Sequence, residues 1–277
     1  MCATCGCSDD TGTRVTDPDH VHEHTHGHDH AHDHSHDHDH DHAHTHDHPH
    51  HEDEPRPHTI TLEQDVLAKN SLLAERNRGW FAGRSILALN LMSSPGSGKT
   101  TLLERTIRDL GPDLPMAVVE GDQETLLDAD RIRATGCRVV QINTGSGCHL
   151  DAAMLADGLG VLDPPSGSVL MIENVGNLVC PALFDLGEQA RVVIMSVTEG
   201  ADKPLKYPHM FRTADLMLVN KIDLLPYVDF DVQRAVEYAR RARPDVQVLE
   251  VSATRGDGLD AWYDWLRTQL AAVKRPD

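Results

Sequence analysis

A glycine-rich segment that ends in Lys-Thr-Thr lies between a short apolar run and a helical pattern. Residues 93–101 have the sequence Ser-Ser-Pro-Gly-Ser-Gly-Lys-Thr-Thr, after the run 86–92 and before the pattern 102–110. Glycines at this spacing let backbone N–H groups surround a β-phosphate, and the positive end of the following helix adds to them. The lysine neutralises phosphate oxygens and the first threonine offers its hydroxyl to Mg²⁺. We expect a phosphate-binding loop made by Gly96, Ser97, Gly98, Lys99, Thr100 and Thr101.

The first position of this segment departs from the usual pattern. That pattern opens with glycine, whereas Ser93 stands there in this chain. The alternative is a plain Gly/Ser turn that happens to end in Lys-Thr. The apolar run before the segment and the helical pattern after it favour the phosphate-binding loop, because this motif joins a strand to a helix.

A second motif indicates which base the nucleotide carries. Asn220, Lys221 and Asp223 follow the apolar run 216–219. A carboxylate in such a loop accepts both N1–H and N2–H₂ of guanine, a donor pair that adenine lacks, and the lysine stem covers the base. The sequence therefore predicts GTP and GDP as ligands. Ser252 and Ala253 follow the next apolar run, where a backbone N–H can bind guanine O6.

Two acidic residues, Asp122 and Glu173, lie just past the ends of apolar runs. In an open α/β sheet this is the edge that binds ligands. The segment 173–176, Glu-Asn-Val-Gly, is similar to the Asp-x-x-Gly element that responds to a γ-phosphate. We expect both carboxylates either to lie beside Mg²⁺ or to position the attacking water. Together with Lys99 they form the expected catalytic set. Plain surface carboxylates at strand ends are the alternative.

Cysteine and histidine suggest a second site. Cys148 and His149 follow one apolar run, and Cys180 follows another, so the three side chains are expected to converge at the same sheet edge. Two thiolates and an imidazole suit Zn²⁺ or Ni²⁺. A structural metal site usually has four ligands, so three favour a site that is shared across a dimer interface. The alternative is two small buried cysteines and a helix-start histidine; Cys137 is assigned to the core.

The N-terminal segment has a different composition from the remainder of the chain. Cys2, Cys5 and Cys7 precede any core and, in a reducing compartment, predict a metal site rather than a disulfide. Seventeen of the 20 histidines lie in the His/Asp tract from His20 to His51. A segment with so little apolar surface is expected to be disordered. Neutral imidazoles bind metal, so the tract should store Ni²⁺ above about pH 6.5 and release it below. A solubilising tail is the alternative.

Seven short apolar runs alternate with helical patterns in the remainder of the chain. Such runs are typical of strands buried on both faces of a parallel sheet, and residues 259–273 form an amphipathic last helix. A capping-box spacing at Thr61 and an apolar stripe through Leu62, Val66, Leu67 and Leu73 predict a first helix, broken at Gly79 and Gly83. We expect an α/β phosphate-loop NTPase domain over residues 59–277, after a disordered metal-binding tail over residues 1–58. The predicted strands are 86–92, 116–119, 137–142, 169–172, 192–197, 216–219 and 246–251.

Composition excludes several classes of protein. The 277 residues carry a net charge of −19, which argues against sequence-independent binding of nucleic acid. No apolar run approaches the roughly 18 residues that a membrane helix needs. The N-terminus lacks a basic flank and an apolar region, so no secretory signal is expected and a cytoplasmic location follows.

Taken together, the motifs are similar to those of the hydrogenase nickel incorporation family, HypB, whose members are GTPases of [NiFe]-hydrogenase maturation. The resemblance runs from Leu62 to the C-terminus. It implies a nickel site at the three N-terminal cysteines and a weaker nickel or zinc site at Cys148, His149 and Cys180, near the interface of a GTP-dependent homodimer. It also implies that a lysine of the segment 203–206, of which we favour Lys206, reaches the partner's nucleotide. The most specific stretches are 93–103, 120–124, 143–151, 173–177 and 198–208.

The resemblance also implies partners and a working scheme. The partners are other hydrogenase maturation factors and the precursor of the hydrogenase large subunit. Loss of the γ-phosphate moves loops joined to Glu173, displaces Cys180 and lowers metal affinity. Hydrolysis should be slow, because no arginine finger is evident. Three alternatives stay open: a urease accessory GTPase, a nickel or zinc buffering protein with a regulatory nucleotide domain, and a GTPase for organometallic cofactor loading.

Overall fold

The computed structural model describes residues 14–16, 57–122, 127–145 and 147–274. Side chains are described from Gln64 onward. The three N-terminal cysteines and the His/Asp tract lie outside these residues, so the expectations for them stay predictions.

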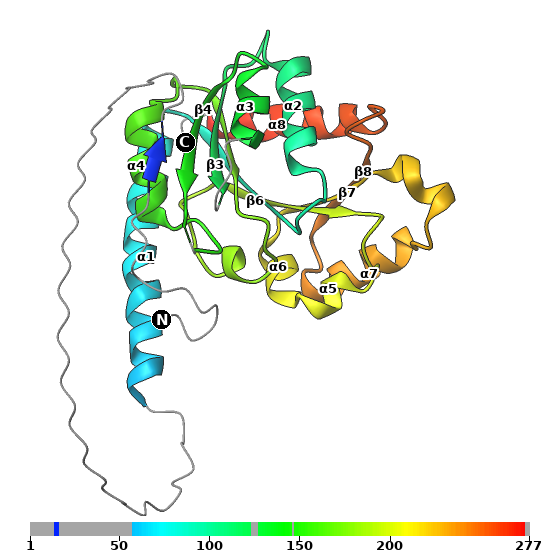
Figure 1. Cartoon of the computed structure of the whole chain (residues 1–277), viewed down its shortest axis with the longest axis horizontal. Coiled ribbons are helices and arrows are strands. Elements are labelled where there is room, and N and C mark those ends of the chain that lie inside the picture. The colour runs from blue at the N-terminus through cyan, green and yellow to red at the C-terminus, as the bar shows by residue number, and fades with distance from the viewer. Residues whose placement is uncertain (1–13, 17–56, 123–126, 146, 275–277) are drawn as a thin grey trace, which may run out of the picture.

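An eight-stranded sheet forms the centre of the molecule (Figure 1). Its strand order is β1-β4-β3-β5-β2-β6-β7-β8, and the seven strands from β2 to β8 are parallel. All seven predicted strands are confirmed, with bounds that differ by at most three residues. The strands are β1 (Arg14–Thr16), β2 (Leu87–Ser93), β3 (Met116–Asp122), β4 (Arg138–Asn143), β5 (Val169–Glu173), β6 (Ala190–Ser196), β7 (Leu216–Asn220) and β8 (Gln247–Val251).

Strand β1 was not expected. The prediction of a disordered tail over residues 1–58 is wrong for residues 14–16, which pair antiparallel with β4. An edge strand presents unpaired backbone N–H and C=O groups, and a short segment of the chain satisfies them here without needing an apolar face.

Helices cover both faces of the sheet. One face packs against α2 (Lys99–Leu110), α3 (Leu127–Arg133) and α8 (Leu259–Val273), with Trp262 and Leu266 among the fully buried side chains. The other face packs against α1 and α4 over its β4 side and against α6 and α7 over its β7 side. These helices and the short ones between them are α1 (Pro57–Gly83), α4 (Ala152–Leu162), η1 (Cys180–Ala182), α5 (Lys203–Lys206), α6 (Pro208–Thr213), η2 (Ile222–Tyr227) and α7 (Val232–Ala242).

Helix α1 differs from the expected first helix in three ways. It begins at Pro57, before the expected capping box, and it runs through Gly79 without a break to end at Gly83. Val66 and Leu67 are exposed, although they belong to the apolar stripe that predicts this helix. Figure 1 gives the reason: the N-terminal part of α1 projects beyond the sheet and only its C-terminal part packs on it.

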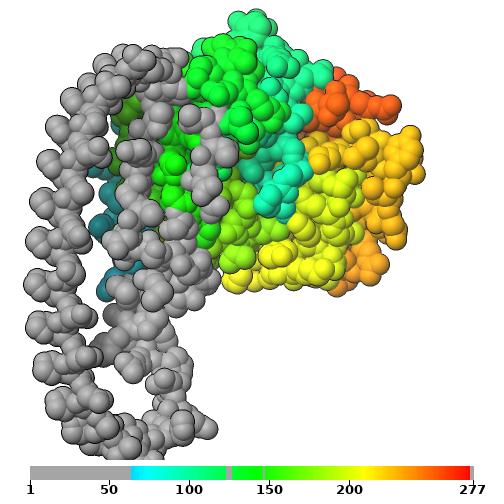
Figure 2. All heavy atoms as spheres, in the orientation of Figure 1, coloured from blue at the N-terminus to red at the C-terminus, as the bar shows by residue number. Residues whose placement is uncertain are grey.

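The topology determines where ligands meet. Strand β2 lies between β5 and β6, and the chain crosses from one side of β2 to the other after β5. In open α/β sheets this switch point, at the carboxyl ends of the strands, is the ligand-binding crevice. In the space-filling view, the blue-green residues near 100 border the yellow-green residues near 200 at this part of the surface (Figure 2).

No helix in the described part of the chain is long and apolar enough to cross a membrane. Cys137, which the sequence assigns to the core, is partly buried and packs against the cluster on the α2 face.

Candidate functional site

The predicted phosphate-binding loop joins β2 to α2, as the motif requires. Gly96 and Gly98 have positive φ values of 73° and 96°, a conformation that glycine adopts without steric strain. A Cβ at Gly98 would also lie 2.6 Å from Nδ2 of Asn220, so two independent constraints require glycine there. The first residues of α2, Lys99 and Thr100, are buried at the helix N-terminus. The backbone therefore has the shape and the positive helix end that bind a phosphate.

Ser93, which replaces the usual glycine, lies in β2 with a negative φ, so the backbone does not require glycine at this position. Its hydroxyl donates to the carbonyl of Ser94 over 2.7 Å and accepts from Nζ of Lys99 over 3.0 Å. The serine thus holds the lysine side chain inside the loop.

Asn220 and Lys221 hold the base side of the site against the phosphate-binding loop. Asn220 Nδ2 donates to the carbonyl of Ser97 over 2.9 Å, and Lys221 Nζ donates to the carbonyl of Gly96 over 2.7 Å. Lys221 has a φ of 64°, a left-handed conformation that starts η2 and brings Asp223 into the same loop. The motif and the loop, which are more than 120 residues apart in sequence, form one unit.

The expected guanine-binding residues also lie together. Asp223 Oδ1 accepts from the hydroxyl of Ser252 over 2.6 Å, which orients the carboxylate. The N–H of Ala253 donates to Oδ1 of Asn220 over 3.2 Å, and this hydrogen bond orients the Asn220 side chain. The contact of this N–H with guanine O6 stays a prediction.

Glu173 lies beside Lys99 and Thr100 on the other side of the loop. The hydroxyl of Thr100 donates to Glu173 Oε1 over 3.0 Å, and Lys99 Nζ is 4.0 Å from the same oxygen. Burial raises the pKa of Glu173 to about 6, although Lys99 and the Thr100 hydroxyl oppose the shift. Lys99 and Glu173, two of the three expected catalytic residues, therefore lie together with Thr100.

Glu120 is a member of the site that sequence analysis missed. It pairs with Glu173 across β3 and β5 and is only 2% exposed. Burial raises the pKa of Glu120 to about 9, with further contributions from Glu173, Asp128 and Asp122. An acidic residue directly after the apolar run 116–119 was the available clue, but only the strand register reveals its neighbour.

The carboxylates suit a divalent cation. Within the described part of the chain, Oε2 of Glu120 and Oε2 of Glu173 are buried and make no hydrogen bond. Buried acceptors without partners are costly, and an oxygen-ligated cation beside the Thr100 hydroxyl would pair them. The donor set therefore fits Mg²⁺.

Asp122, the other expected acidic residue, ends β3 and is partly exposed. Its carbonyl accepts from the N–H of Thr144 over 3.0 Å. The hydroxyl of Thr144 in turn donates to the carbonyl of Gly147 over 2.8 Å. Asp122 is thus joined through its backbone to the loop that leads to Cys148.

Segment 173–176 reaches the phosphate-binding loop itself. A Cβ at Gly176 would lie 3.2 Å from atoms of Pro95, so the two backbones are in close contact. A response of this segment to a γ-phosphate stays a prediction.

Cys148, His149 and Cys180 converge as expected. Their ligand atoms all lie within 4.8 Å of one another, although Cys180 is more than 30 residues away in sequence. The ring of His149 stacks on Phe184, with centroids 3.9 Å apart, and burial lowers the pKa of His149. A neutral imidazole and two thiols are the ligand types that Ni²⁺ and Zn²⁺ favour, and binding of either ion here stays a prediction.

The two lysines of α5 have different environments. Lys203 pairs with Glu199 over 2.6 Å and donates to the hydroxyl of Ser94, so it faces the phosphate-binding loop of its own chain. Lys206 has 62% of its side chain exposed and pairs with Asp202 over 2.8 Å. Of the two, Lys206 is accessible to a second molecule.

Comparisons with known proteins identify the family. Residues 87–250 match the model described as CobW/HypB/UreG, nucleotide-binding domain. The chain is 58% identical over 213 residues to "Hydrogenase maturation factor HypB" of Escherichia coli (strain K12), covering 77% of this chain and 73% of that protein. The chain belongs to the HypB family. Its relative in Azotobacter vinelandii, with the same name, is 60% identical over 210 residues, or 76% of this chain and 69% of that protein.

Solved structures of this family share the fold. HypB from Helicobacter pylori in complex with nickel superposes with a TM-score of 0.70 at 36% identity, covering 75% of this chain and 98% of that one. HypB from Archaeoglobus fulgidus gives a TM-score of 0.69 at 41% identity, covering 73% of this chain and 99% of that one. The family and the phosphate-loop fold that the sequence predicts are therefore confirmed.

Proposed function

We propose that the chain is a GTP-hydrolysing nickel chaperone that delivers Ni²⁺ to the precursor of the [NiFe]-hydrogenase large subunit, together with other maturation factors. The observation that supports this most directly is the convergence of Cys148, His149 and Cys180. Cys148 and His149 lie on a loop whose base is hydrogen-bonded to Asp122. Its membership of a family of hydrogenase maturation factors agrees with this function.

Each part of the site has a task in this proposal. The amides of the phosphate-binding loop and Lys99 bind the β- and γ-phosphates, and Asp223 selects guanine. Thr100 and Glu173 would hold Mg²⁺, which neutralises charge on the phosphate oxygens. Asp122 positions the attacking water. Lys99 and Lys203 reach the loop, whereas Arg131 is held by the Thr101 hydroxyl and by Glu104. Since no arginine finger is evident in the sequence, turnover by one chain alone should be slow.

The metal ligands act as a releasable nickel site. Loss of the γ-phosphate frees segment 173–176 from the phosphate-binding loop and displaces Cys180, so the affinity of the site falls. Cys2, Cys5 and Cys7 form a second nickel site, and the His/Asp tract stores further Ni²⁺. Lys206 reaches the nucleotide of a partner in a GTP-dependent homodimer. Reduced thiols are needed throughout, which places the protein in the cytoplasm.

Metal titration tests this function. Ni²⁺ and Zn²⁺ are titrated into the full chain and its Cys2→Ala variant, with GDP and with a non-hydrolysable GTP analogue. We expect the Cys2→Ala variant to lose one site, and the site at Cys148 to bind metal more weakly with GDP. If the nucleotide changes the affinity of no site, the chain buffers metal and the nucleotide domain has another purpose.

Urease is the second candidate acceptor. The relative from Helicobacter pylori (strain J99) is named "Hydrogenase/urease maturation factor HypB" and is 38% identical over 211 residues. Disruption of the gene distinguishes the two: loss of hydrogenase activity alone supports the proposal, and loss of urease activity alone favours the accessory protein of urease.

A further inference from the structure

Asn174 lies between the nucleotide site and both arms of the metal site. It directly follows Glu173 and is 1% exposed. Its Oδ1 accepts from the N–H of Leu150 over 3.2 Å, and Leu150 directly follows His149. Its Nδ2 donates to Oδ1 of Asn90 over 3.2 Å. One buried amide thus contacts the Cys148 loop and the centre of the sheet.

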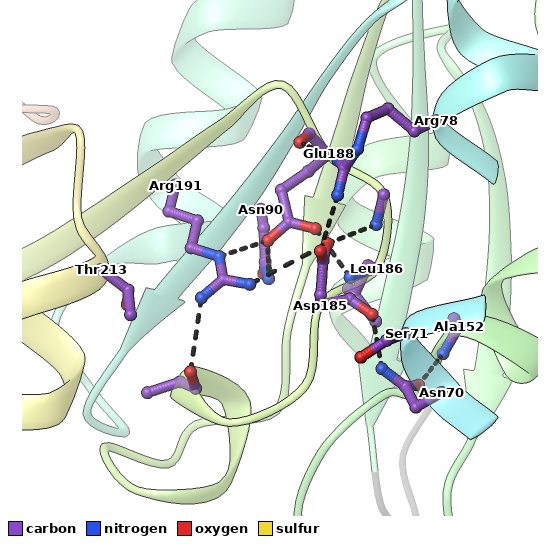
Figure 3. A network of polar contacts seen from close by, with 12 residues as sticks. Asn70, Ser71, Arg78, Asn90, Ala152, Asp185, Leu186, Glu188, Arg191 and Thr213 are labelled. Carbon is purple, nitrogen blue, oxygen red and sulfur yellow. Dashed lines mark hydrogen bonds and ion pairs between the residues drawn. The ribbon is translucent and has the colours of Figure 1, made fainter. Parts of the chain in front are cut away.

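The contacts continue from Asn90 to the segment that carries Cys180. Asn90, in β2, is fully buried, and its Nδ2 donates to Oε1 of Glu188 over 3.3 Å. Arg191 Nε donates to the same oxygen over 2.6 Å, and Arg191 Nη1 donates to the carbonyl of Ala182 over 3.3 Å. Ala182 is the last residue of η1, which begins at Cys180. In Figure 3, dashed lines join the Glu188 carboxylate to both Asn90 and Arg191.

Glu188 holds this segment at a second point. Its Oε2 accepts from the N–H of Leu186 over 2.8 Å, and its carbonyl accepts from Arg78 Nη1 over 3.2 Å. The carboxylate is nearly fully buried and has three donors, so it is well satisfied and rigid.

We propose that Asn174, Asn90, Glu188 and Arg191 form a polar relay that couples the nucleotide state to the affinity of the metal site, and that Asn90 is the positioning residue that joins its two halves. The inference rests on the proposed function, because it supplies the route for a nucleotide-dependent metal affinity. These side chains are not metal ligands and do not contact the phosphate-binding loop through any hydrogen bond of the described residues.

The physical reason is the cost of leaving buried polar groups without partners. A buried donor or acceptor that loses its partner costs about 1–3 kcal/mol. When Glu173 moves with the nucleotide, Asn174 therefore cannot move alone: its shift leaves the Leu150 N–H and the Asn90 amide unpaired unless both follow. Leu150 carries His149 with it, and Asn90 carries Glu188 and the segment of Cys180. The donor atoms change their separation together, which changes metal affinity.

The chain offers a matched control in Asn77. This asparagine is also buried, and its Nδ2 donates to the carbonyl of Leu186 over 3.1 Å and to that of Ala152 over 2.9 Å. It therefore holds the same segment without reaching Asn174. Asn90→Leu breaks the relay, whereas Asn77→Leu removes a comparable buried amide beside it.

The test compares Zn²⁺ affinity in two nucleotide states. Competition with a chromophoric chelator is measured on the full chain with GDP and with a non-hydrolysable GTP analogue, and the full chain with Cys148→Ser and Cys180→Ser serves as the blank for the tail. We expect the wild type to differ at least about 5-fold between the two states. Asn90→Leu should reduce this ratio to less than 2-fold, and Asn77→Leu should retain it.

Several outcomes overturn the relay. The relay is refuted if the affinity ratio of Asn90→Leu is more than half of the wild-type ratio. It is also refuted if Asn77→Leu lowers the ratio as much as Asn90→Leu does, because loosening of the segment alone would then explain the loss. If Asn90→Leu does not fold, as judged by urea unfolding, the affinity ratio is measured for Glu188→Gln instead and compared with the wild-type ratio in the same way. A wild type without any difference between the states refutes the proposed function itself, which distinguishes the two failures.

Discussion

Replacing Glu120 by glutamine should remove part of the pH dependence of stability of the ligand-free protein. Glu120 is 2% exposed, lies opposite Glu173, and has one oxygen without a hydrogen bond in the described part of the chain. Burial and the nearby carboxylates raise its pKa from 4.5 to about 9. The folded protein therefore keeps a proton on Glu120 at neutral pH.

The unfolded chain loses this proton near pH 4.5, whereas the folded chain keeps it until about pH 9. Between these values the folded state binds more protons, so the contribution of Glu120 to stability is full below pH 4.5 and is lost as the pH rises towards 9. The slope is about 1.4 kcal/mol per pH unit. Between pH 6 and pH 8 the wild type should lose about 2.7 kcal/mol that the glutamine variant keeps.

Urea unfolding at pH 6, 7 and 8, without nucleotide or divalent metal, measures this difference. Histidines are shared by both proteins and cancel in the comparison. Glu250→Gln, at an exposed position on β8, is the control for removal of a carboxylate elsewhere in the sheet. If the gap between wild type and Glu120→Gln is also constant from pH 6 to pH 8, Glu120 is not held protonated and the argument from burial is wrong.

Three further predictions concern the nucleotide. Gly98→Ala should weaken binding of a GTP analogue at least about 10-fold, since a left-handed alanine costs about 1–2 kcal/mol and its Cβ meets Asn220. Gly79→Ala, at a position in α1 where a Cβ meets no atom, should leave binding unchanged, and equal effects of the two substitutions would contradict the geometry. Asp223→Asn should lower GTP affinity by about 10- to 100-fold and favour XTP, measured by competition, and retained guanine preference would remove Asp223 from the base site. Lys206→Ala should abolish GTP-dependent dimerisation in sedimentation runs, and an unchanged dimer would leave Lys203 as the candidate.

The sheet was predictable because its strands are buried on both faces. Such strands are nearly continuous in Val, Ile, Leu and Met, as in the run Val169–Ile172, and turns separate them clearly. The bounds were less predictable. Strand β3 continues through Glu120 to Asp122 because β4 and β5 pair with these polar residues, and no local property of the sequence shows that pairing.

The phosphate-binding loop and the metal cluster were predictable for a different reason. Their chemistry depends on residue types at fixed spacing, or on loops that leave the same sheet edge. The relay through Asn90 and Glu188 was not predictable, because its members lie 98 residues apart and asparagine and glutamate are ordinarily solvent-exposed. The exposure of Val66 and Leu67 was likewise hidden, because an apolar stripe shows which face could be buried but not whether the helix extends past its partner.

Strand β1 covers the edge of the sheet that lies beside the Cys148 loop. Arg14 lies opposite Asn143 and Thr16 opposite Gln141, so the chain before β1 enters at the carboxyl end of β4, from which the loop to Cys148 leaves. The chain itself therefore closes most of this edge of the sheet with a strand of three residues, and among the described strands β8, at the opposite edge, has the longer side open to pairing with another strand.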